Sequence, residues 1–288
     1  MIIMLSLVTV NYNDSATVVD YVNRILSFKS IDNIIIVDNN STDDSFKYLN
    51  QYYKGTQKIS VIQSGRNGGY GFGNNIGVKY AIEHFNADYI LISNADVEYM
   101  DSTISKLLVF MEQEPELAVI SPYMLDINKI PVPNCAWRIP DKKQAFVAAI
   151  VGIRRNTGLL YDFDKKTSLK YVDCVAGSLL LVRSKAFQEI GGYDENIFLF
   201  CEETLLGIRM KQFGWKSAIV QQEYFIHAHS VSIKKTYQSK KKRDLLTWNS
   251  RKYILQKYYE CKKFELVMMD ILVKFHIGLS DLKHQIIK

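Results

Sequence analysis

The sequence predicts an α/β protein with a mostly parallel central sheet that helices cover on both faces. Two observations support this prediction. Short apolar runs alternate with segments of helical periodicity along the first part of the chain, a pattern typical of parallel sheets. Polar clusters follow the ends of four of these runs, at the sheet edge where such folds bind their ligands.

The first elements can be placed from these runs. Strands are predicted at residues 2–10, 33–37, 59–63 and 89–93. Asp14-Ser15 and the pair Ser41 and Asp44 are typical of helix starts, the second pair at capping-box spacing. Helices are therefore expected at residues 18–26, after Asp44, at 74–85 and from about Asp101.

The polar clusters stand at the carboxyl ends of the four predicted strands. Each one alone is ordinary turn chemistry, because Asn, Asp, Ser and Gly favour loops. Four such clusters at one edge favour a ligand site. They are Asn11-Tyr12-Asn13, Asp38-Asn39-Asn40, Arg66-Asn67-Gly68-Gly69 and Asn94-Ala95-Asp96.

The middle of the chain, residues 122–170, has little periodicity and contains most of the prolines. It predicts a long surface excursion, as a lid or an acceptor-facing loop. Regular structure is expected to return at 171–182, where "GSLLLV" predicts a buried strand. A helix at 184–190, a helix that starts at Glu202-Glu203 and ends at Gly214, and a strand at 224–226 should follow.

The last part of the chain is basic and then amphipathic. Lysines and arginines dominate from Lys234 to Lys263. Apolar residues then recur at helical spacing, at Phe264, Val267, Met268, Ile271, Leu272, Phe275 and Leu279. The pattern favours either an anionic membrane surface or packing on the catalytic domain or on a second subunit, and both alternatives stay open.

Bulk composition narrows the class of protein. A chain of 288 residues with net charge +6 can bury a sizeable core without disulfides or structural zinc. The four cysteines form no C-x-x-C pair, which favours a reducing compartment. The N-terminal run lacks a basic leader and no uncharged run is long enough to span a bilayer, so a cytoplasmic protein is expected, with peripheral membrane attachment as an open alternative. The basic run lacks a nucleic-acid recognition motif, so no nucleic-acid partner is expected.

A glycine-rich loop, "GGYGFGNNIG", comes close to a dinucleotide-binding fingerprint. That fingerprint belongs after the first strand, whereas this loop follows the third. A nicotinamide-dependent dehydrogenase is therefore disfavoured. Contact between loop amides and a phosphate, or a turn that permits close packing, are the two remaining interpretations.

Two further groups of ionisable residues stand out. Glu202 and Glu203 begin a predicted helix, where acids usually stabilise the helix dipole, and neighbouring side chains there diverge by about 100°. His227 and His229 alternate at the end of a predicted strand. Two histidines alone do not make a metal site, but Asp96 could supply an oxygen ligand.

These motifs occur in the order seen in family 2 glycosyltransferases, and the sequence resembles the bacterial rhamnosyltransferase-type branch. The resemblance covers residues 4 to 235, approximately, and rests on "VTVNYN", "IIIVDNNSTDDS", "NGGYGFGNNIGVKYA", "LISNADV", "VAGSLLLVRSKAFQEIGGYDENIFLFCEE" and "HAHSVS". It implies a GT-A fold, Rossmann-like, with a C-terminal helical extension. It also implies a catalytic domain over 1–235, with a nucleotide-sugar half to about 121 and an acceptor half from about 122, and a basic amphipathic extension over 236–288.

The resemblance also implies a role for each matching residue. Asp96 ends the family's D-x-D or N-x-D motif and would bind a divalent ion, Mg²⁺ or Mn²⁺, with His227, or His229 as second choice. Glu203 stands where the family has its catalytic base, usually Asp, and Glu202 precedes it. The implied donor-binding residues are Val10, Asn11, Tyr12, Asp38, Asn40, Arg66, Asn67, Gly69, Asn75, Asn94, Asp96 and Gly177.

The implied activity is inverting transfer of a sugar from a nucleotide-diphosphate donor to a glycan acceptor. Rhamnose from dTDP-rhamnose and a lipid-linked acceptor of a capsule or cell-wall polysaccharide suit the branch best. A UDP-sugar transferase acting with galactofuranose, galactose or glucose, and a non-catalytic nucleotide-sugar-binding module, are the alternatives. The C-terminal helices could also mediate homo-oligomer formation.

Overall fold

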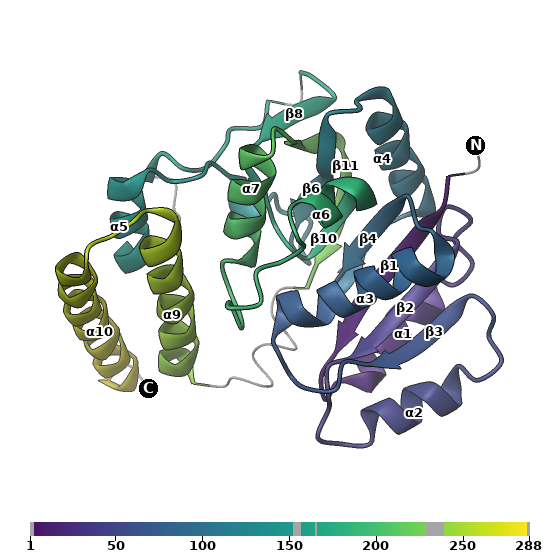
Figure 1. Ribbon diagram of the computed structural model, residues 1–288, viewed down its shortest axis with the longest axis horizontal. Helices are drawn as coiled ribbons and strands as arrows, with labels where there is room; N and C mark the ends of the chain where they lie inside the picture. Colours follow the sequence, from purple (N-terminus) through teal and green to yellow (C-terminus); the bar gives the residue numbers. More distant parts are fainter. Residues whose placement is uncertain (1–2, 152–156, 165, 229–238, 287–288) are drawn as a thin grey trace.

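The computed structural model describes residues 3–151, 157–164, 166–228 and 239–286. A mixed sheet forms its centre, and a pair of long helices, α9 and α10, lies at one end (Figure 1). The strands are β1 (Leu5–Asn11), β2 (Asn33–Asp38), β3 (Ile59–Gln63), β4 (Tyr89–Ser93), β5 (Val97–Glu98), β6 (Leu117–Leu125), β7 (Ala136–Trp137), β8 (Leu169–Val172), β9 (Cys174–Val175), β10 (Leu179–Arg183) and β11 (Lys216–His227).

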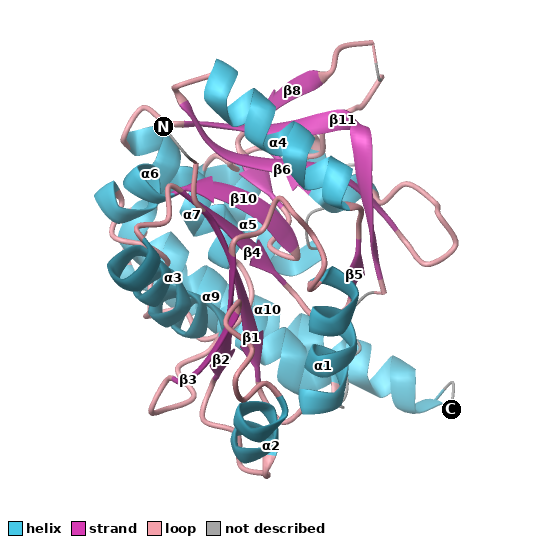
Figure 2. Ribbon diagram, turned by 90° about the vertical axis from the view of Figure 1, so that its right-hand side faces the viewer, coloured by secondary structure: helices cyan, strands magenta, loops and turns pink. Residues whose placement is uncertain are grey.

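The helices connect and cover these strands. They are α1 (Ser15–Ile25), α2 (Ser45–Tyr52), α3 (Tyr70–Phe85), α4 (Asp101–Gln113), η1 (Pro133–Cys135), α5 (Lys142–Val151), α6 (Ser184–Glu189), α7 (Glu202–Gln212), α9 (Lys240–Tyr258) and α10 (Lys263–Ile286). Figure 2 shows α3, α6 and α7 on one face of the sheet and α1 and α4 on the other. The predicted two-sided covering is confirmed.

The sheet has the strand order β3-β2-β1-β4-β10-β6-β11-β5. β5 pairs with the last two residues of β11, and β8 pairs with its first half, at Ser217–Val220. Within the described residues, β3, β2, β1, β4, β6 and β11 run in one direction, and β10, β5 and β8 run against them. The sheet is therefore mostly parallel, as predicted, with one antiparallel strand inserted at its centre.

The core comes from strands that are buried on both faces. Ile34, Ile35, Ile36 and Val37 of β2 are all fully buried, as are Ile90, Leu91 and Ile92 of β4. Such continuous burial explains why these strands read as unbroken apolar runs instead of alternating ones. The first two strand predictions need only small corrections at their ends, since β1 starts at Leu5 and ends at Asn11.

The glycine-rich loop forms the first turns of α3, four residues before the predicted start at Asn74. A Cβ added to Gly77 would lie 2.4 Å from a methyl of Val8 and 2.8 Å from a methyl of Val37. Glycine at this position lets α3 lie directly on β1 and β2. For Gly77, close packing is therefore the interpretation that holds.

Three features of the middle and later parts of the chain differ from the predictions. Residues 117–125 form the long central strand β6, which was not predicted because Pro122 cannot donate a ladder hydrogen bond. Its partner β11 starts at Lys216 and not at residue 224, and the register between them shifts from Val220 to Tyr224, opposite this proline. The predicted surface excursion also contains the helix α5, whose sequence lacks a clear apolar stripe.

The buried strand predicted at "GSLLLV" is confirmed as β10, and the residues from 169 to 175 before it form two further short strands. β8 pairs with β11, β9 pairs with β7 in a separate two-stranded sheet, and β10 enters the main sheet beside β4. The breaks fall at Asp173 and at Ala176-Gly177-Ser178. Both breaks redirect the chain toward α7, where a Cβ on Gly207 would lie 2.5 Å from the carbonyl oxygen of Asp173.

The predicted C-terminal helical extension is present as the hairpin α9–α10. Its core consists of Trp248 and Leu255 of α9, Cys261, four residues of α10 and Ala149 of α5. Asp194 joins α9 to the main domain, because its carboxylate accepts hydrogen bonds from Tyr253 (2.9 Å), Tyr258 (3.1 Å) and Lys257 (3.2 Å). Burial opposes the charged form of Asp194, but hydrogen bonds from Asn196, Tyr253 and Lys257 outweigh it and lower the pKa of Asp194 to about 2.

We predict that Gly77→Ala lowers the free energy of unfolding by about 1–3 kcal/mol, because the added methyl overpacks the contact between α3 and the sheet. Chemical denaturation of both proteins measures the difference. Lys79→Ala, on the exposed side of the same helix, is the control and should change stability by less than about 0.5 kcal/mol. Equal effects of the two substitutions would contradict the packing argument.

Candidate functional site

A pocket of about 200 Å³ opens at the carboxyl edge of the sheet, where β1, β2 and β4 end. Its lining combines residues that follow these strands with residues of three distant segments. They are Val10, Asn11, Tyr12, Asp14, Thr17, Val18, Asn39, Asn67, Gly69, Tyr70, Asn94, Ala95, Asp96, Phe198, Leu199 and His227. The position agrees with the ligand sites of open α/β sheets.

Asp38 supports the pocket from behind. Its side chain is fully buried and accepts hydrogen bonds from Asn11 Nδ2 (2.8 Å), Ser41 Oγ (2.7 Å) and the Ser41 amide (2.9 Å). Asn11 lines the pocket and is 1% exposed. Asp38 therefore orients Asn11 and is not itself a lining residue.

Asn39 lines the pocket, whereas its neighbour Asn40 was the predicted donor-binding residue. The Asn39 side chain is buried and donates to the carbonyl of Gly69 (3.0 Å) and to Asn67 Oδ1 (3.2 Å). Asn40 is exposed and in the left-handed region, with φ of 59°. The reversal of the chain at Asn40 turns the Asn39 side chain inward, which a run of two asparagines does not reveal.

The loop before α3 contacts the segment before α7. Tyr70 N–H donates to the carbonyl of Phe198 (3.1 Å), and a Cβ on Gly69, whose φ is 92°, would lie 1.8 Å from that oxygen. Gly69 is therefore needed both for its positive φ and for this close approach. The contact places Phe198 and Leu199 in the wall of the pocket.

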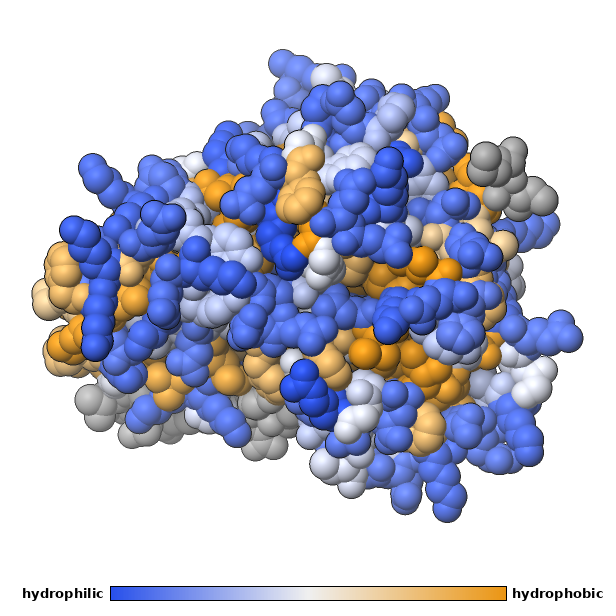
Figure 3. Space-filling view, viewed as in Figure 1, coloured by the Kyte–Doolittle hydropathy of each residue, from blue (hydrophilic) through white to orange (hydrophobic). Residues whose placement is uncertain are grey.

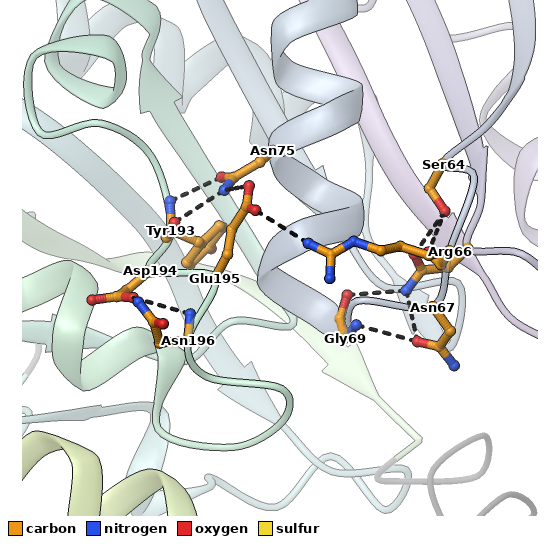
Figure 4. A network of polar contacts seen from close by, with 10 residues as sticks. Ser64, Arg66, Asn67, Gly69, Asn75, Tyr193, Asp194, Glu195 and Asn196 are labelled. Carbon is orange, nitrogen blue, oxygen red and sulfur yellow. Dashed lines mark hydrogen bonds and ion pairs between the residues drawn. The ribbon is translucent and has the colours of Figure 1, made fainter.

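Asn75 and Arg66 strengthen the same contact and do not line the pocket. Figure 4 shows the Asn75 side chain directed at Tyr193 and Glu195. Asn75 accepts from the Tyr193 amide (2.9 Å) and donates to the Tyr193 carbonyl (3.0 Å). Arg66 lies 3.8 Å from Glu195 in an exposed ion pair, and its guanidinium lies over Phe72. Both residues act on the position of the loop at 193–199.

Asp96 and His227 meet at the floor of the pocket. Asp96 Oδ1 lies 3.3 Å from His227 Nε2, and the two side chains are only 10% and 12% exposed. Strand pairing places them there, since β5 pairs antiparallel with the end of β11 and the Ala228 amide donates to the Asp96 carbonyl (3.0 Å). His229, the second choice as metal ligand, lies outside the described residues.

Glu202 and Glu203 follow a strained turn. Phe200 and Cys201 both have positive φ, 70° and 69°, which is costly for side chains of this size. Glu203 accepts a hydrogen bond from the Gly177 amide (3.3 Å), and a Cβ on Gly177 would lie 2.9 Å from the same carboxylate oxygen. Glu202 is 5% exposed, and its Oε1 is buried without a hydrogen-bond partner. The two carboxylates therefore differ sharply in environment.

Burial raises the pKa of both carboxyl groups, and the charge of Glu203 adds to the effect on Glu202. Tyr70 connects this pair to the pocket: it lines the pocket, and its hydroxyl donates to the Gly177 carbonyl (2.6 Å). Burial and then the charges of Glu203, Glu202 and Asp96 raise the pKa of Tyr70. A carboxyl pair of raised pKa next to a polar pocket suits proton transfer.

The structure thus separates the predicted site residues into two groups. Val10, Asn11, Tyr12, Asn67, Gly69, Asn94, Asp96 and His227 line the pocket, while the residues behind or beside it are Asp38, Asn40, Arg66, Asn75, Gly177, Glu202 and Glu203. The pocket also has lining residues that were not among the individually predicted ones: Asp14, Thr17, Val18, Asn39, Tyr70, Ala95, Phe198 and Leu199. Tyr70 lies in the quoted glycine-rich loop, so its position next to Gly69 was an available signal.

Comparison with known families defines the class of this protein, a glycosyltransferase. Residues 6–190 match the family model described as "Glycosyl transferase family 2", and the chain belongs to that family. The match covers β1 to α6, and therefore most of the pocket.

Three curated relatives are 27–28% identical to this chain. The low-salt glycan biosynthesis hexosyltransferase Agl10 of Haloferax volcanii is 28% identical over 200 residues, which are 69% of this chain and 59% of that protein. The N-acetylglucosaminyl-diphospho-decaprenol L-rhamnosyltransferase of Mycobacterium tuberculosis is 28% identical, over 68% of this chain and 67% of the relative. The rhamnosyltransferase WbbL of Escherichia coli is 27% identical, over 72% and 78%. The match thus spans less than two thirds of the haloarchaeal relative.

Solved structures share the fold at low identity. GalNAc-T7, solved with UDP, GalNAc and Mn²⁺, has a TM-score of 0.61 and 16% identity over 78% of this chain and 44% of its own. The mannosyltransferase PcManGT of Pyrobaculum calidifontis, solved with GDP-Man and Mn²⁺, has a TM-score of 0.55 and 9% identity over 96% and 86%. These likenesses confirm the predicted GT-A architecture.

We predict that Glu202 makes stability fall as pH rises above about 4.3, the ordinary pKa of glutamate. The native state then keeps a proton that the unfolded chain has lost, so the free energy of unfolding decreases until native Glu202 ionises. Denaturation at about pH 5 and pH 7.5 should show a smaller decrease for Glu202→Gln than for the wild type, by on the order of 1–3 kcal/mol. Glu83→Gln, at an exposed position, is the control. Identical pH dependence in all three proteins would exclude a raised pKa at Glu202.

Proposed function

We propose that the protein is an inverting glycosyltransferase that moves a sugar from a nucleotide-diphosphate donor to a glycan acceptor. The observation that carries this proposal is the pocket itself. It places Asp96 and His227 3.3 Å apart on its floor, and Tyr70 connects it to the carboxyl pair Glu202-Glu203. A metal-binding group for a diphosphate and a base for an acceptor hydroxyl are the two parts that this reaction requires.

The donor set fits a divalent cation. Asp96 supplies a carboxylate and His227 an imidazole, ligands that suit Mn²⁺ as well as Mg²⁺. Within the described ranges, no cluster of three or more His, Cys, Asp or Glu side chains could hold a metal by itself. The donor diphosphate would therefore complete the coordination, and when bound the cation neutralises charge on the leaving diphosphate. GalNAc-T7 and PcManGT were both solved with Mn²⁺.

Asn11 and Asn39 would orient the nucleoside at the ends of β1 and β2. Both are buried side chains held by internal hydrogen bonds, so they present fixed polar groups to a ligand. Fixed polar groups provide specificity because an ill-fitting nucleoside leaves them unpaired. Asp38 acts through Asn11 in this scheme.

Glu203 would act as the base. The Gly177 amide holds one oxygen of its carboxylate, and burial raises its pKa toward the range where a base works at neutral pH. It takes the proton of the acceptor hydroxyl while that oxygen attacks the anomeric carbon on the face opposite the diphosphate. Glu202 is more deeply buried and lies next to Gly71, directly after the turn at Phe200-Cys201, and burial together with the charge of Glu203 raises its own pKa.

For the donor we propose rhamnose on dTDP, and for the acceptor a lipid-linked glycan of a surface polysaccharide. Two of the relatives are rhamnosyltransferases, and the mycobacterial one is named for a decaprenol-linked acceptor. A UDP-sugar is the competing donor.

Donor and metal are tested together by thermal shift, with dTDP-rhamnose, UDP-glucose and UDP-galactose, each with and without Mn²⁺. We predict that dTDP-rhamnose with Mn²⁺ stabilises the wild type, as a ligand of the native state must. In Asp96→Asn the gain due to Mn²⁺ should be lost while the melting temperature without ligand stays close to that of the wild type.

The control for this experiment is Asn94→Asp, which adds a carboxylate to the same turn and should keep the metal response. A full metal response in Asp96→Asn would remove Asp96 from the metal site. Stabilisation by UDP-sugars alone would replace the proposed donor.

We predict that Glu203→Gln lowers turnover by roughly 10²–10⁴ with little change in donor affinity, because the amide keeps the shape but cannot take a proton. Glu202→Gln should lower turnover by a smaller factor. Gly177→Ala tests the position of the base separately, since the added methyl displaces the Glu203 carboxylate without removing it. If Glu202→Gln is inactive and Glu203→Gln is active, the base is one residue earlier in the chain.

A further inference from the structure

The helix α10 has two apolar faces on opposite sides. Leu266, Met269, Val273 and Ile277 form the inner face, which is buried against Trp248 and Leu255 of α9 and against α5. At about 100° per residue these four positions centre on one line along the helix. The inner face therefore accounts for the attachment of α10 to the rest of the protein.

A second set of apolar residues, the outer face of α10, centres about 180° away from the first. Its members were the amphipathic stripe recognised in the sequence, and each one is exposed. The exposed fractions are 65% for Phe264, 52% for Val267, 58% for Met268, 62% for Ile271, 47% for Leu272, 66% for Phe275 and 44% for Leu279. Apolar residues gather over α10 at the left edge of the space-filling view (Figure 3). The outer face does not pack on the catalytic domain, which removes one of the alternatives left open by the sequence.

The hairpin α9–α10 that presents this face is basic, mainly through residues of α9. Residues 240–279 contain ten Lys and Arg and four Asp and Glu, a net charge of +6. The whole chain has 36 and 30, also +6, so the other residues have 26 of each sign. Lys263 and Lys274 lie along one border of the outer face, about 20° apart around the helix, and Lys274 forms an ion pair with Asp270 (2.7 Å).

The two candidate occupants differ in charge. A second copy of the chain would bring an identical surplus of positive charge to the contact, which opposes association. A bilayer surface with anionic lipids complements both the apolar residues and the lysines. Among the helices that the structure describes, none is long and apolar enough to cross a membrane. A helix with these properties lies in the plane of the lipid headgroups.

We propose that the outer face of α10 docks the protein onto an anionic membrane surface. The docking element is joined to the pocket wall through α9, because Ser250 Oγ donates to the carbonyl of Leu199 (2.8 Å) and Asp194 binds Tyr253. The pocket is thereby held at a fixed position relative to the bilayer. If the acceptor is lipid-linked, a point that rests on the function proposed above, its headgroup lies at the same surface.

Flotation of the full-length protein with vesicles tests the proposal. The protein should float with vesicles of phosphatidylcholine and phosphatidylglycerol and not with phosphatidylcholine alone. The variant Phe264→Ser/Ile271→Ser/Phe275→Ser should bind the anionic vesicles on the order of 100-fold less. A truncation before α10 is unsuitable, because it would expose Trp248 and Leu255.

The matched control is Val109→Ser/Ile127→Ser/Phe213→Ser, which removes apolar groups that are 52%, 67% and 57% exposed elsewhere on the protein. It should bind like the wild type. Lys263→Gln should weaken binding about five-fold, and added salt should reproduce this effect. Binding is measured without donor or acceptor, so its outcome is independent of the proposed activity.

Three outcomes would overturn the proposal. The first is no flotation with anionic vesicles, and the second is equal loss of binding in the α10 triple variant and in the control. The third is a dimer, seen by light scattering, that the α10 triple variant abolishes while the wild type fails to bind vesicles. That result would assign the outer face to a second copy of the chain.

Discussion

Two residues of β5 pair with the last two residues of β11, and the pocket depends on this contact. The pairing sets Val97 opposite His227 and therefore brings Asp96 within 3.3 Å of the imidazole. The hydrogen bond from the Ala228 amide to the Asp96 carbonyl adds a backbone constraint on the carboxylate side. Backbone pairing fixes the relative position of two side chains from distant segments, because the strand register sets where their Cα atoms lie.

The opposite wall of the pocket is held by the segment from Tyr193 to Cys201. On one side the segment contacts the start of α3, through close packing at Gly69 and hydrogen bonds of Tyr70 and Asn75. On the other side it accepts hydrogen bonds from Ser250 and Tyr253 of α9. The C-terminal hairpin is thus part of the structure that shapes the site. A displacement of α9 would therefore shift Leu199 in the pocket wall.

Features that cost folding free energy are concentrated around Glu202 and Glu203. Two consecutive residues in the left-handed region cost on the order of 1 kcal/mol each, and a buried carboxyl oxygen without a partner costs more. The surrounding contacts hold this arrangement, since the Leu205 amide bonds the Cys201 carbonyl and the Tyr70 amide bonds that of Phe198. Strain and unpaired polar groups that persist at one place in a fold are a common property of reactive sites.

The sequence by itself determined the parallel part of the sheet and the edge of the sheet at which the pocket opens, and it singled out Asp96 and Glu203 as candidate site residues. Buried strands such as β2 and β4 can be recognised as apolar runs in the sequence. Asp96 and Glu203 stand in motifs that occur in the order seen in the family. Only the tertiary structure decided the rest. β6 and most of β11 were hidden because Pro122 and the polar residues Gln221, Gln222 and Glu223 interrupt their patterns, and burial of Glu223 against Thr103 and Lys106 depends on distant partners. The choice of Asn39 over Asn40, the role of Tyr70 and the exposure of the outer face of α10 follow from where the backbone turns and what packs beside it, which local patterns do not encode.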